Sequence, residues 1–305
     1  MVATLGEAPP DAGRPRTSPA IRLSSFLHRS PRVRLAALLA APMAWLVVAY
    51  LGSLAVMFAA ALWSTNDFTG ALVKHLTWEN FQTLVQQPVY RRIAARTVGV
   101  AALVTVLDAL IALPVAFYMA KVASRRARRL LVAAILTPLW ASYLVKAYAW
   151  RVMLSSDGPV DWALRPLGLS GPGYGLAAVT LTLAYLWLPY MVLPVYAGLD
   201  RLPDSLLEAS SDLGASAWRT FRSVVLPMLF PALVAGSIFT FSLSLGDYIT
   251  VKIVGGRTQL FANVIYDNIG VADNLPFAAA AAVMPVLLIL LYLVLVRRTG
   301  ALENL

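Results

Sequence analysis

The sequence predicts an all-α, polytopic membrane protein with six transmembrane helices and both termini in the cytoplasm. Of the 305 residues, 59% are hydrophobic and only 13% are charged. Several apolar stretches reach the roughly 20 residues that a helix needs to cross a bilayer. A soluble helical bundle would need polar helix faces, whereas Leu35–Trp63 carries no charge at all. The apolar runs are continuous and do not alternate with polar residues, so they indicate helices and exclude membrane-spanning barrel strands.

The apolar runs divide the chain into one membrane domain with two tails. Residues 1–31 are rich in Pro, Ala and Arg and lack apolar periodicity, which predicts a disordered basic cytoplasmic tail. The membrane domain is expected over residues 32–298, followed by a short cytoplasmic tail at 299–305. The predicted spans are Leu35–Trp63, Thr97–Ala120, Leu130–Trp150, Gly173–Leu199, Val224–Thr250 and Phe277–Val296. Prolines that favour kinks within these spans are Pro114, Pro138, Pro189, Pro194, Pro231 and Pro285.

The basic residues predict the orientation. Lys and Arg gather in four segments: before the first span, between the second and third, between the fourth and fifth, and after the sixth. An even number of spans places these four segments on one side, and the positive-inside rule makes that side the cytoplasm. Because the basic residues lie next to apolar runs, membrane orientation explains the net charge of +10 and no nucleic-acid partner is needed. The two longer external segments are Ser64–Arg96, with a short surface helix expected near Trp78–Phe81, and Ser155–Pro172, expected as loop.

The residues needed for most enzyme chemistry are missing from the sequence. It has no cysteine and two histidines, His28 and His75, in different segments. There is no Ser/His/Asp set, no metal-ligand cluster and no phosphate-binding loop of the form GxxxxGK[ST]. We therefore expect no catalytic residue, no metal and no cofactor bound by this chain, and any ATP must be bound by a partner.

A polar insertion separates the fourth and fifth spans. Residues 202–214 predict a short helix with Asp204 or Ser205 as N-cap, Glu208 in its early part, and Gly214 ending it in a left-handed conformation. Ser216 is placed to cap a second helix that continues into the fifth span. Leucines give the first helix an apolar side, so an amphipathic connector on the lipid headgroups is an alternative interpretation.

The spacing of this insertion resembles the EAA loop of bacterial ABC importer permeases. The motif is Glu-Ala-x, three residues, Gly, nine residues, then aliphatic-x-Leu-Pro, and it falls on Glu208, Ala209, Gly214 and Val224–Pro227. Ser210 replaces the usual second Ala. The resemblance implies a coupling loop at about residues 200–227 that docks in a groove of a cytoplasmic ATPase. The residues it assigns to this contact are Glu208, Ala209, Ser210, Asp212, Leu213, Gly214 and Pro227.

The likeness covers most of the chain, from about Arg32 to Arg298. Val145–Leu154, Leu188–Pro194, Leu213–Phe221 and Ser244–Thr250 are similar to segments of spermidine/putrescine-type permeases. The resemblance implies a MetI-like type I permease fold in the bacterial inner membrane. It also implies three kinds of partner: a second, homologous permease subunit, an ABC ATPase dimer and an extracytoplasmic substrate-binding protein. Relatives with this pattern also serve iron chelates, opines and other organic solutes.

Charged residues within the predicted spans are candidates for the substrate pathway. Asp108 and Asp247 are costly to place in a bilayer, and such carboxylates usually face a cavity or a partner. Asp247 could attract a cationic substrate, with a cation–π contribution from Tyr248, or it could pair with Lys146 or Arg151. Lys146, where spermidine/putrescine-type permeases usually have Arg, is itself a candidate pathway residue. Tyr148 and Trp150 could stack on an amine or belong to the interfacial aromatic belt. An intramembrane enzyme and an ion-coupled secondary transporter are the alternative functions.

Overall fold

The computed structural model describes residues 31–66 and 69–297, and the chain forms two compact units, residues 1–57 and 58–305. The described part of the first unit is residues 31–57, in which α2 (Pro31–Leu46), the π-helical turn η1 (Val47–Leu51) and the start of α3 (Gly52–Ala60) follow one another without a break. Leu38–Ala60 is long and apolar enough to cross a membrane, close to the predicted first span. The predicted tails at 1–31 and 299–305 lie outside the described residues, except that Pro31 opens α2.

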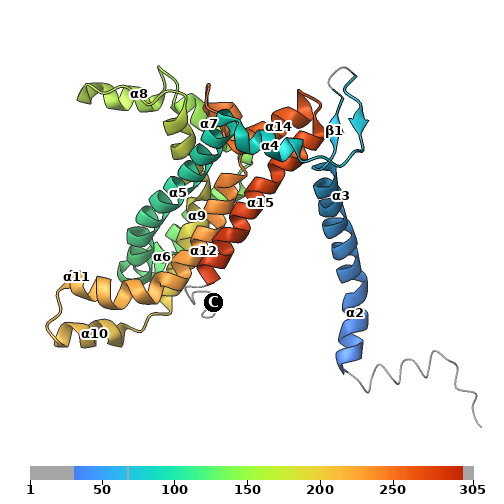
Figure 1. The fold of residues 1–305 in the computed structure, drawn as a ribbon. Coiled ribbons are helices and arrows are strands. Elements are labelled where there is room, and N and C mark those ends of the chain that lie inside the picture. Colours follow the sequence, from blue (N-terminus) through green and yellow to red (C-terminus); the bar gives the residue numbers. More distant parts are fainter. Residues whose placement is uncertain (1–30, 67–68, 298–305) are drawn as a thin grey trace, which may run out of the picture. The chain divides into compact units, whose positions relative to one another are not determined.

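Three long helices form the centre of the second unit. They are α5 (Pro88–Phe117), which continues through the π-turn η2 (Tyr118–Val122), α9 (Leu176–Asp200) and α12 (Leu226–Leu245). These three helices pack along one another, and α15 (Leu275–Arg297) packs beside α12 (Figure 1). Their buried faces consist mainly of aliphatic side chains and alanines, as is usual for apolar helices in a bundle.

Two glycines allow α9 and α12 to approach closely. A Cβ atom added at Gly198 would lie 2.9 Å from the Cβ of Ala232, and one added at Gly236 would lie 2.6 Å from the sulfur of Met191. The distance at Gly198 is shorter than Cβ atoms tolerate, and at Gly236 the added atom would also lie only 3.1 Å from the Met191 Cα, which cannot move aside as the sulfur can. Glycine at these positions therefore lets the two helix backbones pack directly, as is common between membrane helices.

The predicted third span is not one straight helix. It consists of α6 (Arg125–Trp140) and α7 (Tyr143–Met153), which are bent by 98° at the break between them. Ala141 and Ser142 both have extended backbone angles, so the helical hydrogen bonds stop there. Pro138 weakens the preceding turn because it lacks an N–H group. The chain therefore has five helices that could cross a membrane among its described residues, or six if this bent pair is one span.

The predicted fifth span, Val224–Thr250, also ends early. The α12 helix stops at Leu245, residues 246–248 are not helical, and α13 (Ile249–Val254) begins a separate turn. After α13, the chain forms α14 (Phe261–Gly270), which the sequence did not predict. The fourth and sixth spans agree with α9 and α15 to within a few residues.

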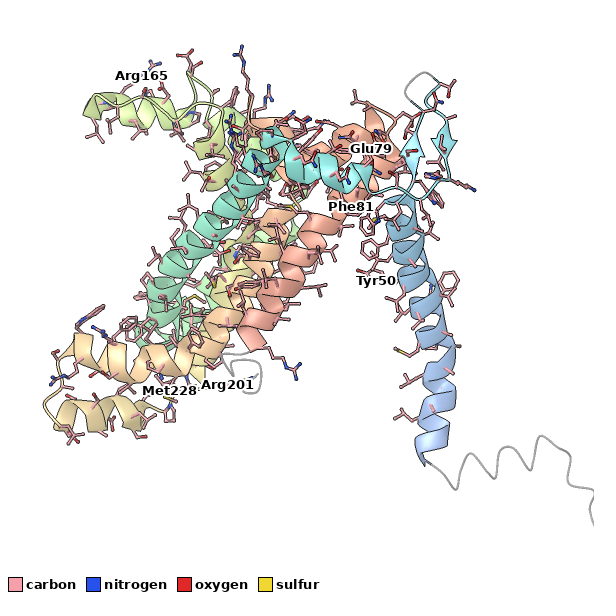
Figure 2. The ribbon with its side chains drawn as sticks, viewed as in Figure 1. Tyr50, Glu79, Phe81, Arg165, Arg201 and Met228 are labelled. Carbon is pink, nitrogen blue, oxygen red and sulfur yellow. The ribbon has the colours of Figure 1, made fainter. Side chains whose placement is uncertain are left out.

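Short elements cover the end of the second unit where α5, α9 and α15 begin (Figure 1). Two short antiparallel strands, β1 (Ser64–Thr65) and β2 (Leu72–Val73), form a hairpin. The α4 helix (Glu79–Gln86) is the surface helix expected near Trp78–Phe81. Glu79 and Phe81 of α4 are labelled in Figure 2. Charge counting makes this end the outer one.

The loop predicted at Ser155–Pro172 contains a helix, α8 (Pro159–Leu164), followed by the 3₁₀ turn η3 (Arg165–Leu167). Asp161 organises this segment because its carboxylate accepts hydrogen bonds from the Gly171 amide at 2.9 Å and from the Arg165 guanidinium at 3.0 Å. The Gly171 hydrogen bond, aided by Arg165, holds the pKa of Asp161 below its usual range. Composition alone did not predict that Asp161 would hold this segment together through a hydrogen bond to the backbone ten residues later.

Candidate functional sites at the two ends of the bundle

The α10–α11 hairpin, residues 204–220, lies at the opposite end of the bundle from α4 and α8 (Figure 1). It consists of α10 (Asp204–Asp212) and α11 (Ala217–Thr220), and α11 continues through the π-turn η4 (Phe221–Val225) into α12. Gly214 has a φ of 73°, which confirms the predicted left-handed end of the first helix. Ser216 caps α11 by accepting a hydrogen bond from the Arg219 amide, also as predicted.

The predicted N-cap of α10 is wrong. The helix begins at Asp204 and its N-cap is Pro203, which makes no side-chain capping bond. Asp204 instead accepts a hydrogen bond from the Lys121 ammonium at 2.7 Å. The Asp204 carboxylate therefore forms an ion pair with a neighbouring segment and does not cap its own helix.

Ser210, the one departure from the EAA pattern, has a partner inside the hairpin. Its hydroxyl lies 2.8 Å from that of Thr220, so the two form a hydrogen bond that joins α10 to α11. Ser210 is half-buried, whereas Glu208, Ala209, Asp212, Leu213 and Gly214 are exposed. The extra hydroxyl therefore faces the second helix, and the exposed surface of the hairpin does not depend on it.

Basic side chains tie the base of the hairpin to the loop between α5 and α6. Lys121 donates to the carbonyl of Leu202 at 2.6 Å as well as to Asp204. Arg128 donates to the carbonyls of Met119 and Ala120 and to the Asp200 carboxylate. These two basic residues thus have a second role: Lys121 joins the end of α5 to the start of the hairpin, and Arg128 joins α6 to the ends of α5 and α9.

An apolar groove of about 820 Å³ lies between the end of α5 and the inner face of the hairpin. Phe117 and Tyr118 line it from the α5 side, and Leu207, Trp218 and Phe221 line it from the hairpin. The Trp218 and Phe221 rings stack with their centroids 5.7 Å apart.

The exposed tip of the hairpin combines two carboxylates with a large apolar side chain. Glu208 and Asp212 are one helical turn apart on α10, and Leu213 is 88% exposed. Pro227, which the motif includes, is not part of this tip. It lies in the first turn of α12 and lines a separate cavity of about 470 Å³ with Arg201 and Met228, both labelled in Figure 2.

The second candidate site surrounds Asp247 at the outer end of the bundle. This side chain is buried, with 7% of its surface exposed. One carboxylate oxygen accepts hydrogen bonds from the hydroxyls of Tyr143 and Thr250, and the other accepts one from the Thr250 amide at 2.9 Å. The predicted alternative of an ion pair is not present, since no cation bonds to Asp247 among residues 31–66 and 69–297. Arg151 instead donates to the carbonyl of Ile253.

Aromatic rings surround this carboxylate. A cavity of about 330 Å³ is lined by Tyr143, Trp187, Asp247 and Tyr248 among others. Tyr143 and Trp187 stack with centroids 6.1 Å apart. The indole N–H of Trp187 is buried, and no group within residues 31–66 and 69–297 accepts a hydrogen bond from it. The sequence prediction included Asp247 and Tyr248 but missed Tyr143 and Trp187.

The other predicted pathway residues lie outside this cavity. Asp108 is fully buried on α5, and neither of its carboxylate oxygens has a hydrogen-bond partner among the described residues. Lys146 is half-buried, one helical turn after Tyr143 on α7, and Tyr148 is exposed. Trp150 packs against Tyr185, with ring centroids 5.4 Å apart. Within the described residues, no group of three or more His, Asp or Glu side chains could hold a metal ion.

A bundle of bent apolar helices, with an exposed polar hairpin at one end and a carboxylate in an aromatic cavity at the other, defines an integral membrane transport subunit. Residues 112–299 match the family described as binding-protein-dependent transport system inner membrane component. The chain belongs to this family and is a permease subunit of an ABC importer, located as a multi-pass protein in the cytoplasmic membrane.

Several relatives extend the likeness beyond the family region. The chain is 40% identical over 299 residues to the inner membrane ABC transporter permease protein YdcU of Escherichia coli, covering 93% of this chain and 95% of YdcU. It is 31% identical over 245 residues to the spermidine/putrescine transport system permease protein PotB of Haemophilus influenzae, covering 79% and 85%. A bacterial alginate ABC transporter, solved in complex with its alginate pentasaccharide-bound periplasmic protein, shares the fold with a TM-score of 0.72 at 16% identity, covering 92% of this chain and 97% of that one.

Proposed function

We propose that this chain forms half of the translocation pathway for a small organic polycation of the polyamine class, such as spermidine or putrescine. In this proposal a cytoplasmic ATPase dimer supplies the energy through the α10–α11 hairpin. A second, homologous permease subunit forms the other half of the pathway, and an extracytoplasmic binding protein delivers the substrate. The names of the relatives support the substrate class, since PotB is a spermidine/putrescine permease.

The exposed tip of the hairpin supports the coupling role. Leu213 is an apolar side chain exposed to water, so a partner that covers it would remove apolar surface from water. Glu208 and Asp212 beside it supply charge for a specific contact. Lys121 connects the hairpin to the end of α5 through Asp204, and Arg128 connects the end of α5 to the end of α9 through Asp200. A partner that pushes on the tip would therefore act on two helices of the bundle. Because the sequence has no phosphate-binding loop, we assign ATP binding to that partner.

The observation that carries the substrate class is the buried carboxylate of Asp247 beside an aromatic cavity. Its hydrogen-bond donors are two hydroxyls and one amide, none of which is a cation. A buried carboxylate without a counter-ion attracts a positive charge, and the rings of Tyr143, Trp187 and Tyr248 offer faces that stabilise an ammonium group. Asp247 lies at the outer end of the bundle, where a substrate released by an external binding protein would enter.

Uptake by the assembled transporter tests this proposal. We expect cells that express the two permeases, the ATPase and the binding protein to take up radiolabelled putrescine or spermidine. We expect Asp247→Asn to lower uptake at least tenfold, because the amide keeps the size of the side chain but loses its charge, and tenfold corresponds to about 1.4 kcal/mol.

Asp267→Asn is the matched control. Asp267 also lies at the outer end, but it forms an ion pair with Lys252, 2.6 Å away, and does not line the cavity. Unchanged uptake in Asp247→Asn would contradict the role of this carboxylate. Uptake of an iron chelate or an opine, with no uptake of polyamines, would contradict the substrate class. Uptake without the ATPase would indicate an ion-coupled secondary transporter.

A further inference from the structure

We propose that Tyr143 determines specificity for ammonium groups by occupying the place of the substrate on Asp247 while the site is empty. A primary ammonium group of the substrate would displace the Tyr143 hydroxyl from the carboxylate and then lie against the rings of Tyr143 and Trp187. This inference rests on the proposed polyamine function and adds a residue that the sequence did not indicate.

The hydrogen bonds of Asp247 differ in how readily they can be exchanged. Thr250 is three residues away in the same turn, and both its amide and its hydroxyl bond to the carboxylate. These local bonds persist as long as the start of α13 keeps its conformation. Tyr143 comes from another helix, 104 residues earlier in the chain. Its hydroxyl is therefore the donor that can leave without disrupting the turn around Asp247.

The breaks in two helices meet at this hydrogen bond. Ala141 and Ser142, the extended residues between α6 and α7, directly precede Tyr143. Asp247 itself lies in the non-helical segment between α12 and α13. Neither side chain is fixed within the middle of a long helix, so a small change at either break would separate the two groups.

Displacement would leave no polar group unpaired. The Tyr143 hydroxyl already lies 2.6 Å from the Thr250 hydroxyl, whose oxygen can accept a hydrogen bond from it once the ammonium group occupies Asp247. The ammonium group has three donors and no acceptor, so it replaces a hydroxyl donor on the carboxylate with a charged one, which forms a stronger hydrogen bond. A neutral or anionic solute has no such advantage over Tyr143.

Aromatic faces continue from the carboxylate along the bundle. Tyr143 stacks on Trp187, Trp187 meets Tyr190 edge-on at 5.9 Å, and Tyr190 lies 6.2 Å from Phe239. A ring face within about 6 Å of a cation is attractive. This row of rings could therefore accommodate the alkyl chain and the further amines of a polyamine beyond the first ammonium group.

Two substitutions separate the role of the hydroxyl from that of the ring. In the assembled transporter, Tyr143→Phe removes the competing hydroxyl and keeps the ring, so we expect the KM for putrescine uptake to fall about threefold, the equivalent of one modest hydrogen bond. Tyr143→Leu removes both, and we expect the KM to rise about tenfold through loss of the ring face. Tyr185→Phe is the control, because Tyr185 packs on Trp150 and does not line the cavity.

Each outcome decides between the proposals. An equal rise of the KM in Tyr143→Phe and Tyr143→Leu would show that the hydroxyl only stabilises the structure, and it would overturn the inference while the polyamine function stands. Absence of amine uptake by the wild-type transporter would overturn the proposed function itself. Co-purification of the ATPase with each variant reports whether the complex assembles. If Tyr143→Leu does not assemble, Tyr143→Phe decides alone, and an unchanged or raised KM overturns the inference.

Discussion

At the scale of single residues, Asp108 and Asp247 are both buried carboxylates, yet their surroundings differ. Asp247 accepts three hydrogen bonds beside a cavity, whereas Asp108 has no hydrogen-bond partner in the part of the chain that the structure describes and lines none of the cavities named above. Their sequence signal was the same, an acidic residue in an apolar run. The difference arises from the helix break that brings Tyr143 to Asp247, which no local pattern reveals.

Ser210 gives a prediction at the same scale. Ser210→Ala restores the usual residue of the EAA pattern and removes the hydrogen bond to Thr220, so the loss of stability should be about 0.5–1.5 kcal/mol at most. Uptake and ATPase co-purification should stay at wild-type levels, because the hydroxyl faces α11. Thermal unfolding of Ser210→Ala, Thr220→Ala and the double variant measures the coupling between the two residues. Loss of ATPase co-purification in Ser210→Ala would show instead that the hydroxyl belongs to the docking surface.

At the scale of elements, the sequence predicted helices well and their interruptions poorly. The α9 and α15 helices agree with prediction because unbroken apolar runs suffice to define them. The 98° bend before Tyr143 and the end of α12 at Leu245 both occur inside segments that the sequence predicted as single spans. Pro138 marks the position of the bend only approximately. The hydrogen bond between Tyr143 and Asp247 joins the two breaks and stabilises both. The helix in α8 was missed because Gly and Pro dominate its surroundings.

The end of α10 gives a prediction for the hairpin. An added Cβ at Gly214 meets no atom within 4 Å, but its φ of 73° makes any other residue strained by about 1–2 kcal/mol. Gly214→Ala and Gly214→Glu share that strain, and only Glu adds bulk and charge to the exposed tip. We expect Gly214→Glu to abolish ATPase co-purification while membrane insertion stays normal, and Gly214→Ala to retain most of it. Equal loss in both variants would trace the effect to the backbone instead of the surface.

At the scale of the whole molecule, the charge pattern makes a prediction about sidedness. The hairpin should face the cytoplasm and the α8 segment the outside. Because the chain has no cysteine, Ser205→Cys and Ser156→Cys each introduce one thiol at an exposed position. A membrane-impermeant maleimide should label Ser156→Cys in intact cells and Ser205→Cys only after permeabilisation. The reverse pattern would invert the predicted topology.

The close approach of α9 and α12 has a mechanical consequence. With Gly198 against Ala232 and Gly236 against Met191, side chains of one helix fit into gaps in the other, so the pair resists a shear displacement along its length. Transport motions in such a bundle are then hinge rotations of larger bodies. The non-helical residues 141–142 and 246–248 are the places where the backbone can absorb the rotation. We therefore expect the two glycines to direct motion to these breaks, although neither glycine lies in one.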